Sequence, residues 1–174
     1  MQMGLVADRS RCSGCRCCEV ACSFFHTGAF GYAGSRIQVA RDDRECVYIP
    51  LFCRHCEDPA CATACPTAAI AKEGAGRVVI RAEECIGCGD CTRACPYAVP
   101  EVYEIPRMDA KKGVALICDL CEGDPQCVRF CANEALRYEP LEETRGLGAE
   151  GHMAEVRALL SRSPLSLREG RGRG

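Results

Sequence analysis

Apolar and polar positions along this chain form short runs that are separated by turn-forming residues. Residues 36–40 and Val47–Phe52 are rich in β-branched and aromatic side chains, and the run RVVIR at 77–81 follows the glycine-containing segment 73–76. Runs of this length and composition predict strands, and the residues between them predict the turns of small hairpins. Segments 58–64 and 90–94 have the length of one or two helical turns. The pattern therefore predicts short strands and short helical turns rather than long helices.

The last part of the chain, residues 139–174, has a different pattern. It contains no cysteine and many glycines and arginines, and Met153, Val156, Leu159 and Leu160 have the spacing of one helix face ahead of Pro164. This spacing predicts a short helix. We expect this tail to dock on a partner or to be disordered.

Cysteine dominates the composition, with 18 among 174 residues, and there is no tryptophan. Such a chain has a thin ordinary apolar core, so disulfides or metal–thiolate bonds must add stability. The first residues do not resemble a secretory signal, and no apolar stretch has the length of a membrane span. We therefore expect a cytoplasmic protein, in which dense thiols favour metal binding. The net charge of −2 does not favour a nucleic-acid partner.

Sixteen of the cysteines fall into four groups of four. The groups are Cys12, Cys15, Cys18 and Cys22; Cys53, Cys56, Cys61 and Cys65; Cys85, Cys88, Cys91 and Cys95; and Cys118, Cys121, Cys127 and Cys131. The first and third have the spacing C-x2-C-x2-C-x3-C, whereas the second and fourth have wider middle gaps. Cys17 competes with Cys18 for a place in the first group, and the spacing of the third group favours Cys18. Cys46 lies in a strand-like segment and is expected to be a buried structural thiol.

This spacing indicates iron–sulfur clusters, most of all 4Fe-4S cubanes, which need one thiolate at each of four irons. Two-residue gaps bring three successive sulfurs around one cluster, and Gly14, Gly87 and Gly89 allow close approach of the backbone. Zinc knuckles and a disulfide framework are the alternatives. Zinc sites usually pair two C-x2-C knuckles across a longer stretch, whereas each group here is compact.

The central segment, PLFCRHCEDPACATACPTAAI at 50–70 and ECIGCGDCTRACPY at 84–97, resembles the four-cluster ferredoxin-like electron-transfer subunits of molybdenum and tungsten oxidoreductases. The resemblance spans about residues 5–138. It implies an α+β fold of tandem bacterial-ferredoxin-like lobes with pseudo-twofold symmetry, with short hairpins and short helices around four clusters. An outer lobe would comprise 1–52 with 98–138, and a central lobe 53–97.

The resemblance also implies which cysteines share a cluster, because each lobe of that family exchanges the fourth ligand of its two groups. The implied sets are Cys53, Cys56, Cys61 with Cys95; Cys85, Cys88, Cys91 with Cys65; Cys12, Cys15, Cys18 with Cys131; and Cys118, Cys121, Cys127 with Cys22. Neither Cys22 nor Cys131 is followed by proline, as Cys65 and Cys95 are, so the outer lobe departs from the family pattern.

The function implied is relay of single electrons between a catalytic subunit and another redox partner, without catalysis by this chain. The catalytic partner would contain molybdenum or tungsten, as in a tungsten-dependent aldehyde oxidoreductase or benzoyl-coenzyme A reductase. A flavin-containing or other redox subunit, and further copies of this chain, are the other partners considered. The alternatives are a free polyferredoxin and a subunit of a hydrogenase or carbon monoxide dehydrogenase.

Charged residues within the groups are candidates for tuning cluster potentials. Arg16, Arg54, Arg93 and Arg129 could raise potentials electrostatically, and His55 could donate a hydrogen bond near a cluster. The alternative is that these arginines are solvated surface residues and that His55 is a polar loop residue.

Overall fold

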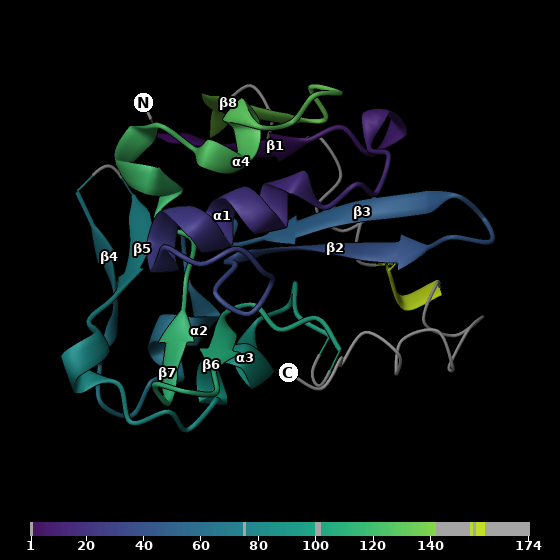
Figure 1. The fold of residues 1–174 in the computed structure, drawn as a ribbon. Helices are drawn as coiled ribbons and strands as arrows, with labels where there is room; N and C mark the ends of the chain where they lie inside the picture. Colours follow the sequence, from purple (N-terminus) through teal and green to yellow (C-terminus); the bar gives the residue numbers. More distant parts are fainter. Residues whose placement is uncertain (1, 75, 100–101, 142–153, 155, 159–174) are drawn as a thin grey trace.

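The structure is a computed structural model, and it describes residues 2–74, 76–99, 102–141, 154 and 156–158. Within these residues four antiparallel strand pairs alternate with short helices (Figure 1). The pairs are β1 (Met3–Ala7) with β8 (Leu136–Pro140), β2 (Ile37–Asp42) with β3 (Val47–Phe52), β4 (Ile70–Glu73) with β5 (Arg77–Ile80), and β6 (Arg107–Asp109) with β7 (Val114–Leu116). The predicted mixture of short hairpins and helices is confirmed.

Four α-helices and three 3-10 turns complete the described elements. The α-helices are α1 (Cys17–Thr27), α2 (Ala60–Thr63), α3 (Asp90–Ala94) and α4 (Gln126–Arg129), and the 3-10 turns are η1 (Arg9–Arg11), η2 (Ala82–Glu84) and η3 (Leu120–Gly123). The predicted helical turns at 58–64 and 90–94 correspond to α2 and α3. At eleven residues α1 is longer than the sequence pattern predicts, and it ends where Gly28 adopts a left-handed conformation with φ of 70°.

The long β2–β3 hairpin and α1 lie across the middle of the molecule (Figure 1). The β1–β8 pair and α4 lie on one side of them, and α2, α3 and the β6–β7 hairpin lie on the other. Strands β1 and β8 pair from Met3 opposite Pro140 to Ala7 opposite Leu136, so residues from the two ends of the described main body are neighbours. No described helix has both the length and the apolar character that a membrane crossing requires.

Three apolar cores hold these elements together, and cysteines contribute to each. Cys18, Cys22, Cys118 and Cys127 are buried in the first core, beside Leu5, Ile37, Val39, Phe52, Leu120 and Leu136. Cys91 is buried in the third core with residues of β4, β5 and β7. The second core lies under the β2–β3 hairpin and includes Val156, which is fully buried. Of the predicted tail helix, Met153, Leu159 and Leu160 lie outside the described residues.

Candidate metal centres

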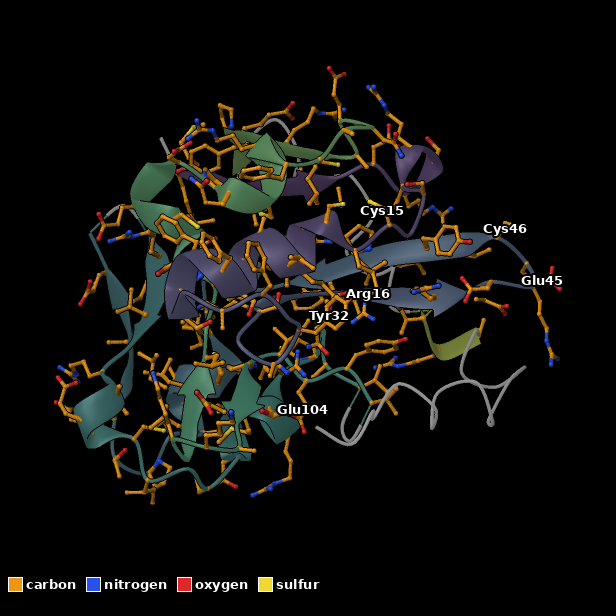
Figure 2. The ribbon with its side chains drawn as sticks, in the orientation of Figure 1. Cys15, Arg16, Tyr32, Glu45, Cys46 and Glu104 are labelled. Atoms are coloured by element: carbon orange, nitrogen blue, oxygen red, sulfur yellow. The ribbon has the colours of Figure 1, made fainter. Side chains whose placement is uncertain are left out.

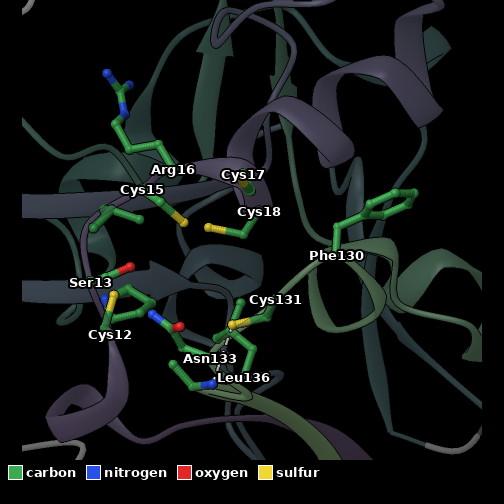
Figure 3. A pocket seen from close by; sticks show the side chains of 13 residues that line it. Cys12, Ser13, Cys15, Arg16, Cys17, Cys18, Phe130, Cys131, Asn133 and Leu136 are labelled. Carbon is green, nitrogen blue, oxygen red and sulfur yellow. Dashed lines mark hydrogen bonds between the residues drawn. The ribbon is translucent and has the colours of Figure 1, made fainter.

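The first cysteine group lines a pocket together with a cysteine from the fourth group. Cys12, Cys15 and Cys18 share with Cys131 a hollow of about 350 Å³ that is partly open to solvent. Figure 3 shows the sulfurs of Cys15 and Cys18 next to each other, while Arg16 extends away from the pocket. Cys12 follows η1, Cys18 lies in α1 and Cys131 follows α4, so three separate elements bring four thiols together.

The third group forms a second pocket with a cysteine from the second group. Cys85, Cys88 and Cys91 line a hollow of about 300 Å³ together with Cys65. Cys85 follows η2 as Cys12 follows η1, and a helix begins within both groups. The two groups that share the 2-2-3 spacing therefore also share a local structure, a 3-10 turn that leads into the cysteines and a helix that follows.

Electrostatics link the remaining cysteines across their groups. Burial, together with nearby Cys95, Cys56 and Cys91, raises the pKa of Cys61 to about 11. Burial, with Cys22 and Asp119 beside it, raises the pKa of Cys118 to about 12. Free thiols in these positions resist ionisation because thiolates would be buried close together. A bound cation would reverse this preference, since metal ligation requires the thiolate form.

The backbone of the C-x2-C turns repeats in all four groups. The residue before the second cysteine has a positive φ each time: 68° at Gly14, 48° at His55, 68° at Gly87 and 60° at Leu120. A Cβ at Gly87 would lie 2.3 Å from the carbonyl oxygen of Gly113, and a Cβ at Gly14 would overlap Tyr48. Glycine is therefore favoured at these two positions by protein contacts, while its expected role in bringing the backbone close to a cluster stays a prediction. That His55 and Leu120 adopt the same uncommon conformation indicates that the turn itself is required.

Hydrogen-bond donors gather around the cysteine sulfurs. The backbone N–H of Arg36 donates to Cys22 Sγ at 3.3 Å, that of Ala135 to Cys131 Sγ at 3.2 Å, and that of His55 to Cys53 Sγ at 3.5 Å. Such donors favour an anionic sulfur. The gathered thiols, the donors to sulfur and the left-handed turns are together suited to binding 4Fe-4S clusters.

Buried polar atoms without a partner support the same interpretation. Among the described residues, the buried side-chain nitrogens and oxygens that lack a hydrogen-bond partner are His55 Nε2 and Arg36 Nε. Both lie on side chains next to the cysteine groups, Arg36 beside Cys22 and His55 between Cys53 and Cys56. Buried donors are rarely left unpaired in native proteins, so an acceptor is expected here.

The two remaining cysteines differ from the sixteen. Cys17 is exposed yet lines the same pocket as Cys15 and Cys18.

The prediction that Cys46 is a buried structural thiol is wrong, because Cys46 is exposed at the tip of the β2–β3 hairpin (Figure 2). Asp42 Oδ1 accepts the backbone N–H groups of Arg44 and Glu45, and this turn ends just before the strand begins at Val47. None of the eighteen cysteines forms a disulfide, and the structure therefore gives no support to a disulfide framework.

Carboxylates pair with arginines that lie within the cysteine groups. Arg16 forms two hydrogen bonds of 2.8 Å with Glu19, Arg93 pairs with Asp90, and Arg129 pairs with Asp124 at 3.2 Å. The Arg16 guanidinium also lies 3.6 Å from the ring centroid of Tyr32, in the middle of the molecule (Figure 2). The carboxylates offset the positive charge of these arginines. This weakens the electrostatic effect on the clusters that the sequence analysis considered for them. Sequence reasoning missed Arg36, which lies outside every group.

Comparison with known proteins matches residues 44–140 to the 4Fe-4S dicluster domain. The aliphatic sulfonate oxidoreductase polyferredoxin-like subunit of Pyrococcus furiosus is 41% identical over 143 residues, which cover 77% of this chain and 79% of that protein. One polypeptide of the anaerobic dimethyl sulfoxide reductase of Escherichia coli K12 is 37% identical over 162 residues, which cover 83% of this chain and 76% of that polypeptide.

Two further proteins extend the comparison. The electron transport protein HydN of Escherichia coli K12 is 36% identical over 86% of this chain and 95% of its own length. Among solved structures, a chain of the active site complex BamBC of benzoyl coenzyme A reductase is 26% identical, covering 92% of this chain and 90% of that one. The TM-score between the two chains is 0.45.

Proposed function

Because this chain belongs to the family of 4Fe-4S dicluster ferredoxin-like proteins, we propose that it is an iron–sulfur subunit that relays single electrons through four 4Fe-4S clusters. The family match covers the second, third and fourth cysteine groups, and the first group precedes it. The proposed count of four rests on the sixteen grouped cysteines, which supply four thiolates for each of four clusters.

We propose that each cluster takes three ligands from one group and the fourth from another. The sets are Cys12, Cys15, Cys18 with Cys131; Cys118, Cys121, Cys127 with Cys22; Cys53, Cys56, Cys61 with Cys95; and Cys85, Cys88, Cys91 with Cys65. These sets correspond to an outer lobe of residues 1–52 with 98–138 and a central lobe of 53–97, related by a pseudo-twofold axis. The pocket that joins Cys131 to the first group carries this proposal, because no reading of the spacing alone would place the two together.

The residues of this chain hold, surround and orient the redox centres. When bound, the clusters supply one-electron redox chemistry, with no bond made or broken in a substrate. Cysteine thiolates bind the irons, backbone N–H groups donate to the sulfurs, and apolar side chains of the three cores keep water from the buried cysteines. A rigid arrangement of this kind favours electron transfer, because the surrounding protein has to reorganise little when a cluster gains or loses an electron. The chain itself is then an electron-transfer subunit rather than a catalyst.

For the partner we propose a catalytic subunit with a molybdenum or tungsten cofactor, such as an aldehyde oxidoreductase. The names of two relatives, which belong to a sulfonate oxidoreductase and to a dimethyl sulfoxide reductase, support a catalytic partner subunit. A second redox protein, a flavin-containing one for example, would exchange electrons at the other end of the cluster series. We place the protein in the reducing cytoplasm, because a chain so rich in cysteine that uses them to bind metal needs thiols that stay reduced.

The first experiment is anaerobic purification of the native protein with analysis of iron and sulfide. Four clusters correspond to about sixteen irons and about sixteen sulfides per chain, whereas stoichiometric zinc or half this iron content would contradict the proposal. Co-purification of a molybdenum- or tungsten-containing subunit is expected. A protein that purifies alone with its full set of clusters would instead be a free polyferredoxin.

The exchange of ligands has its own test. In Cys131→Ala we expect altered electron paramagnetic resonance (EPR) of the cluster at the first group, with the cluster at Cys118, Cys121 and Cys127 retained. Cys15→Ser and Cys121→Ser assign the two signals. Loss of the fourth group's signal alone would show that each group closes its own cluster.

A further inference from the structure

His55 presents a buried hydrogen-bond donor that the described protein atoms leave unpaired. The residue is 2% exposed, and the backbone N–H of Val78 donates to its Nδ1 at 3.0 Å. Nδ1 therefore carries a lone pair, so the ring is neutral and its hydrogen is on Nε2. Nε2, the atom without a partner, is thus an N–H donor.

The second unpaired donor, Arg36 Nε, belongs to a guanidinium that is already held in place. Its Nη1 forms an ion pair with Asp119, and the backbone N–H of the same residue donates to Cys22 Sγ. Asp119 is also 3.1 Å from His26 Nε2. Arg36 Nε is buried among these groups, close to the cysteines that would bind the cluster of the fourth group.

Both donors lie where the second and fourth cysteine groups meet. His55 stands between Cys53 and Cys56, and its ring contacts β5 through Val78. The neighbouring Arg77 donates through Nη1 to the carbonyl oxygen of Asp119 at 3.3 Å, and Asp119 follows Cys118. Cys53 packs against the apolar core in which Cys118 is buried, so the second and fourth groups share this part of the interior. We call the region formed by Cys53, His55, Cys118 and Asp119 the junction.

Leaving a buried N–H unpaired destabilises the folded state, so each of these donors is expected to have an acceptor. The nearby side chains offer thiols, and the carboxylate of Asp119 already accepts from His26, Arg36 and the backbone of Cys121. Anionic sulfur is a kind of acceptor that suits both donors. Iron–sulfur clusters provide it as cysteine thiolate and as sulfide.

We propose that His55 Nε2 and Arg36 Nε donate hydrogen bonds to cluster sulfur at the junction and thereby raise the reduction potential there. The inference rests on the proposed function, because it requires the clusters to be bound. Donation to sulfur stabilises the reduced state more than the oxidised state, since the reduced cluster carries the greater negative charge. Electrons that pass between the two lobes would then meet a higher potential at the crossing.

The test measures midpoint potentials by EPR-monitored redox titration of the cluster-loaded chain. We expect His55→Leu to lower the potential of one cluster and His55→Gln, whose amide can accept from Val78 and donate to sulfur, to restore much of the shift. Arg36→Lys retains a positive charge for Asp119 but removes the Nε donor, and it should lower the potential of the fourth group's cluster. Signals assigned with Cys56→Ser and Cys121→Ser distinguish the cluster of the second group from that of the fourth as the acceptor of His55.

A spectroscopic measurement on the unaltered sequence keeps the inference testable if a variant loses a cluster. Pulsed EPR of protein labelled with 15N-histidine should show a nitrogen coupling that is lost in His55→Leu. His26, whose Nδ1 lies 3.7 Å from Cys22 Sγ, is a second labelled histidine near the fourth group, so its coupling is identified with His26→Gln. Unchanged potentials in both variants, with no coupling that depends on His55, would mean that a buried water accepts these donors and would overturn the inference. Iron and sulfide are measured first, so a chain without four clusters contradicts the proposed function rather than the role of His55.

Discussion

Two adjacent cysteines, Cys17 and Cys18, differ in burial, and the spacing of the third group favours Cys18 as the ligand. Cys18 is buried in the first core beside Cys22 and Cys127, whereas Cys17 is exposed at the start of α1. We expect Cys17→Ser to retain its full iron content and Cys18→Ser to lose the iron of one cluster, because only the buried sulfur belongs to the proposed ligand set. Iron analysis with EPR of both purified proteins decides the matter, and the opposite result would exchange the two assignments.

Glu19 is a second residue whose burial gives it a specific role. Its side chain is nearly inaccessible, and it accepts from Arg16 and, through Oε1, from the backbone N–H of Val39 at 3.0 Å. Glu19 thus ties α1, which carries Cys18 and Cys22, to strand β2. Removing one partner of a buried charge pair leaves the other without compensation.

For Glu19→Ala we expect the free energy of unfolding to fall by about 3 kcal/mol, measured by urea denaturation of the cluster-loaded protein under argon. Asp124→Ala breaks the exposed pair with Arg129 and serves as the control, with almost no change expected. Equal effects in the two variants would show that the link from α1 to β2 is not structural.

The repeated C-x2-C turn is the element with the strictest backbone requirement. Gly87 and Gly113 have nearly the same φ, 68° and 67°, but an added Cβ meets a carbonyl oxygen only at Gly87. Gly113→Ala should therefore lose about 1–2 kcal/mol of stability from conformation alone, whereas Gly87→Ala should lose about 1–3 kcal/mol more because of the clash. Denaturation midpoints and iron content of both variants measure the difference. Similar losses would indicate that the backbone around Gly113 adjusts freely.

Elements were predictable from sequence where the signal was local. The hairpin of β4 and β5 has its turn residues between two apolar runs, and α3 matches the predicted segment 90–94. Strands β1 and β8 pair across nearly the whole chain, and no local pattern indicates such a partner. Helix α1 continues past Cys22 to Thr27, although Gly28 was an available signal for its end.

The candidate site divides in the same way between local and distant information. Spacing identified the four groups, but the pocket that adds Cys131 to the first group depends on tertiary structure. From the sequence, His55 could be either a donor to a cluster or a polar loop residue. Its burial to 2% exposure and its contact with Val78 arise only in the fold, so the sequence could not decide between them. Arg36 follows the same logic, since it reaches Asp119 from a distant part of the sequence.

At the scale of the whole molecule, cysteines supply part of each apolar core, so the clusters and the fold should depend on each other. Metal binding free energy becomes folding free energy when the site does not exist in the unfolded chain. We expect removal of iron by chelation after mild oxidation, with the thiols kept reduced, to unfold the cores around Cys18, Cys118 and Cys91. Far-ultraviolet circular dichroism and limited proteolysis should report this loss, whereas a cluster-free chain with unchanged protease resistance would show that the apolar residues suffice.

The pairing of β1 with β8, together with the pocket shared by Cys12 and Cys131, has a consequence for the order of biosynthesis. A ribosome makes the chain from its first residue, so Cys12, Cys15 and Cys18 emerge long before Cys131 can join them. The cysteines of the second and third groups lie within 53–97, and the pocket they line is completed by Met108 and Ala115, so it can close before Cys131 is made. Assembly would then proceed from the inside outward, and the earliest thiols would need protection from stray metal until translation ends.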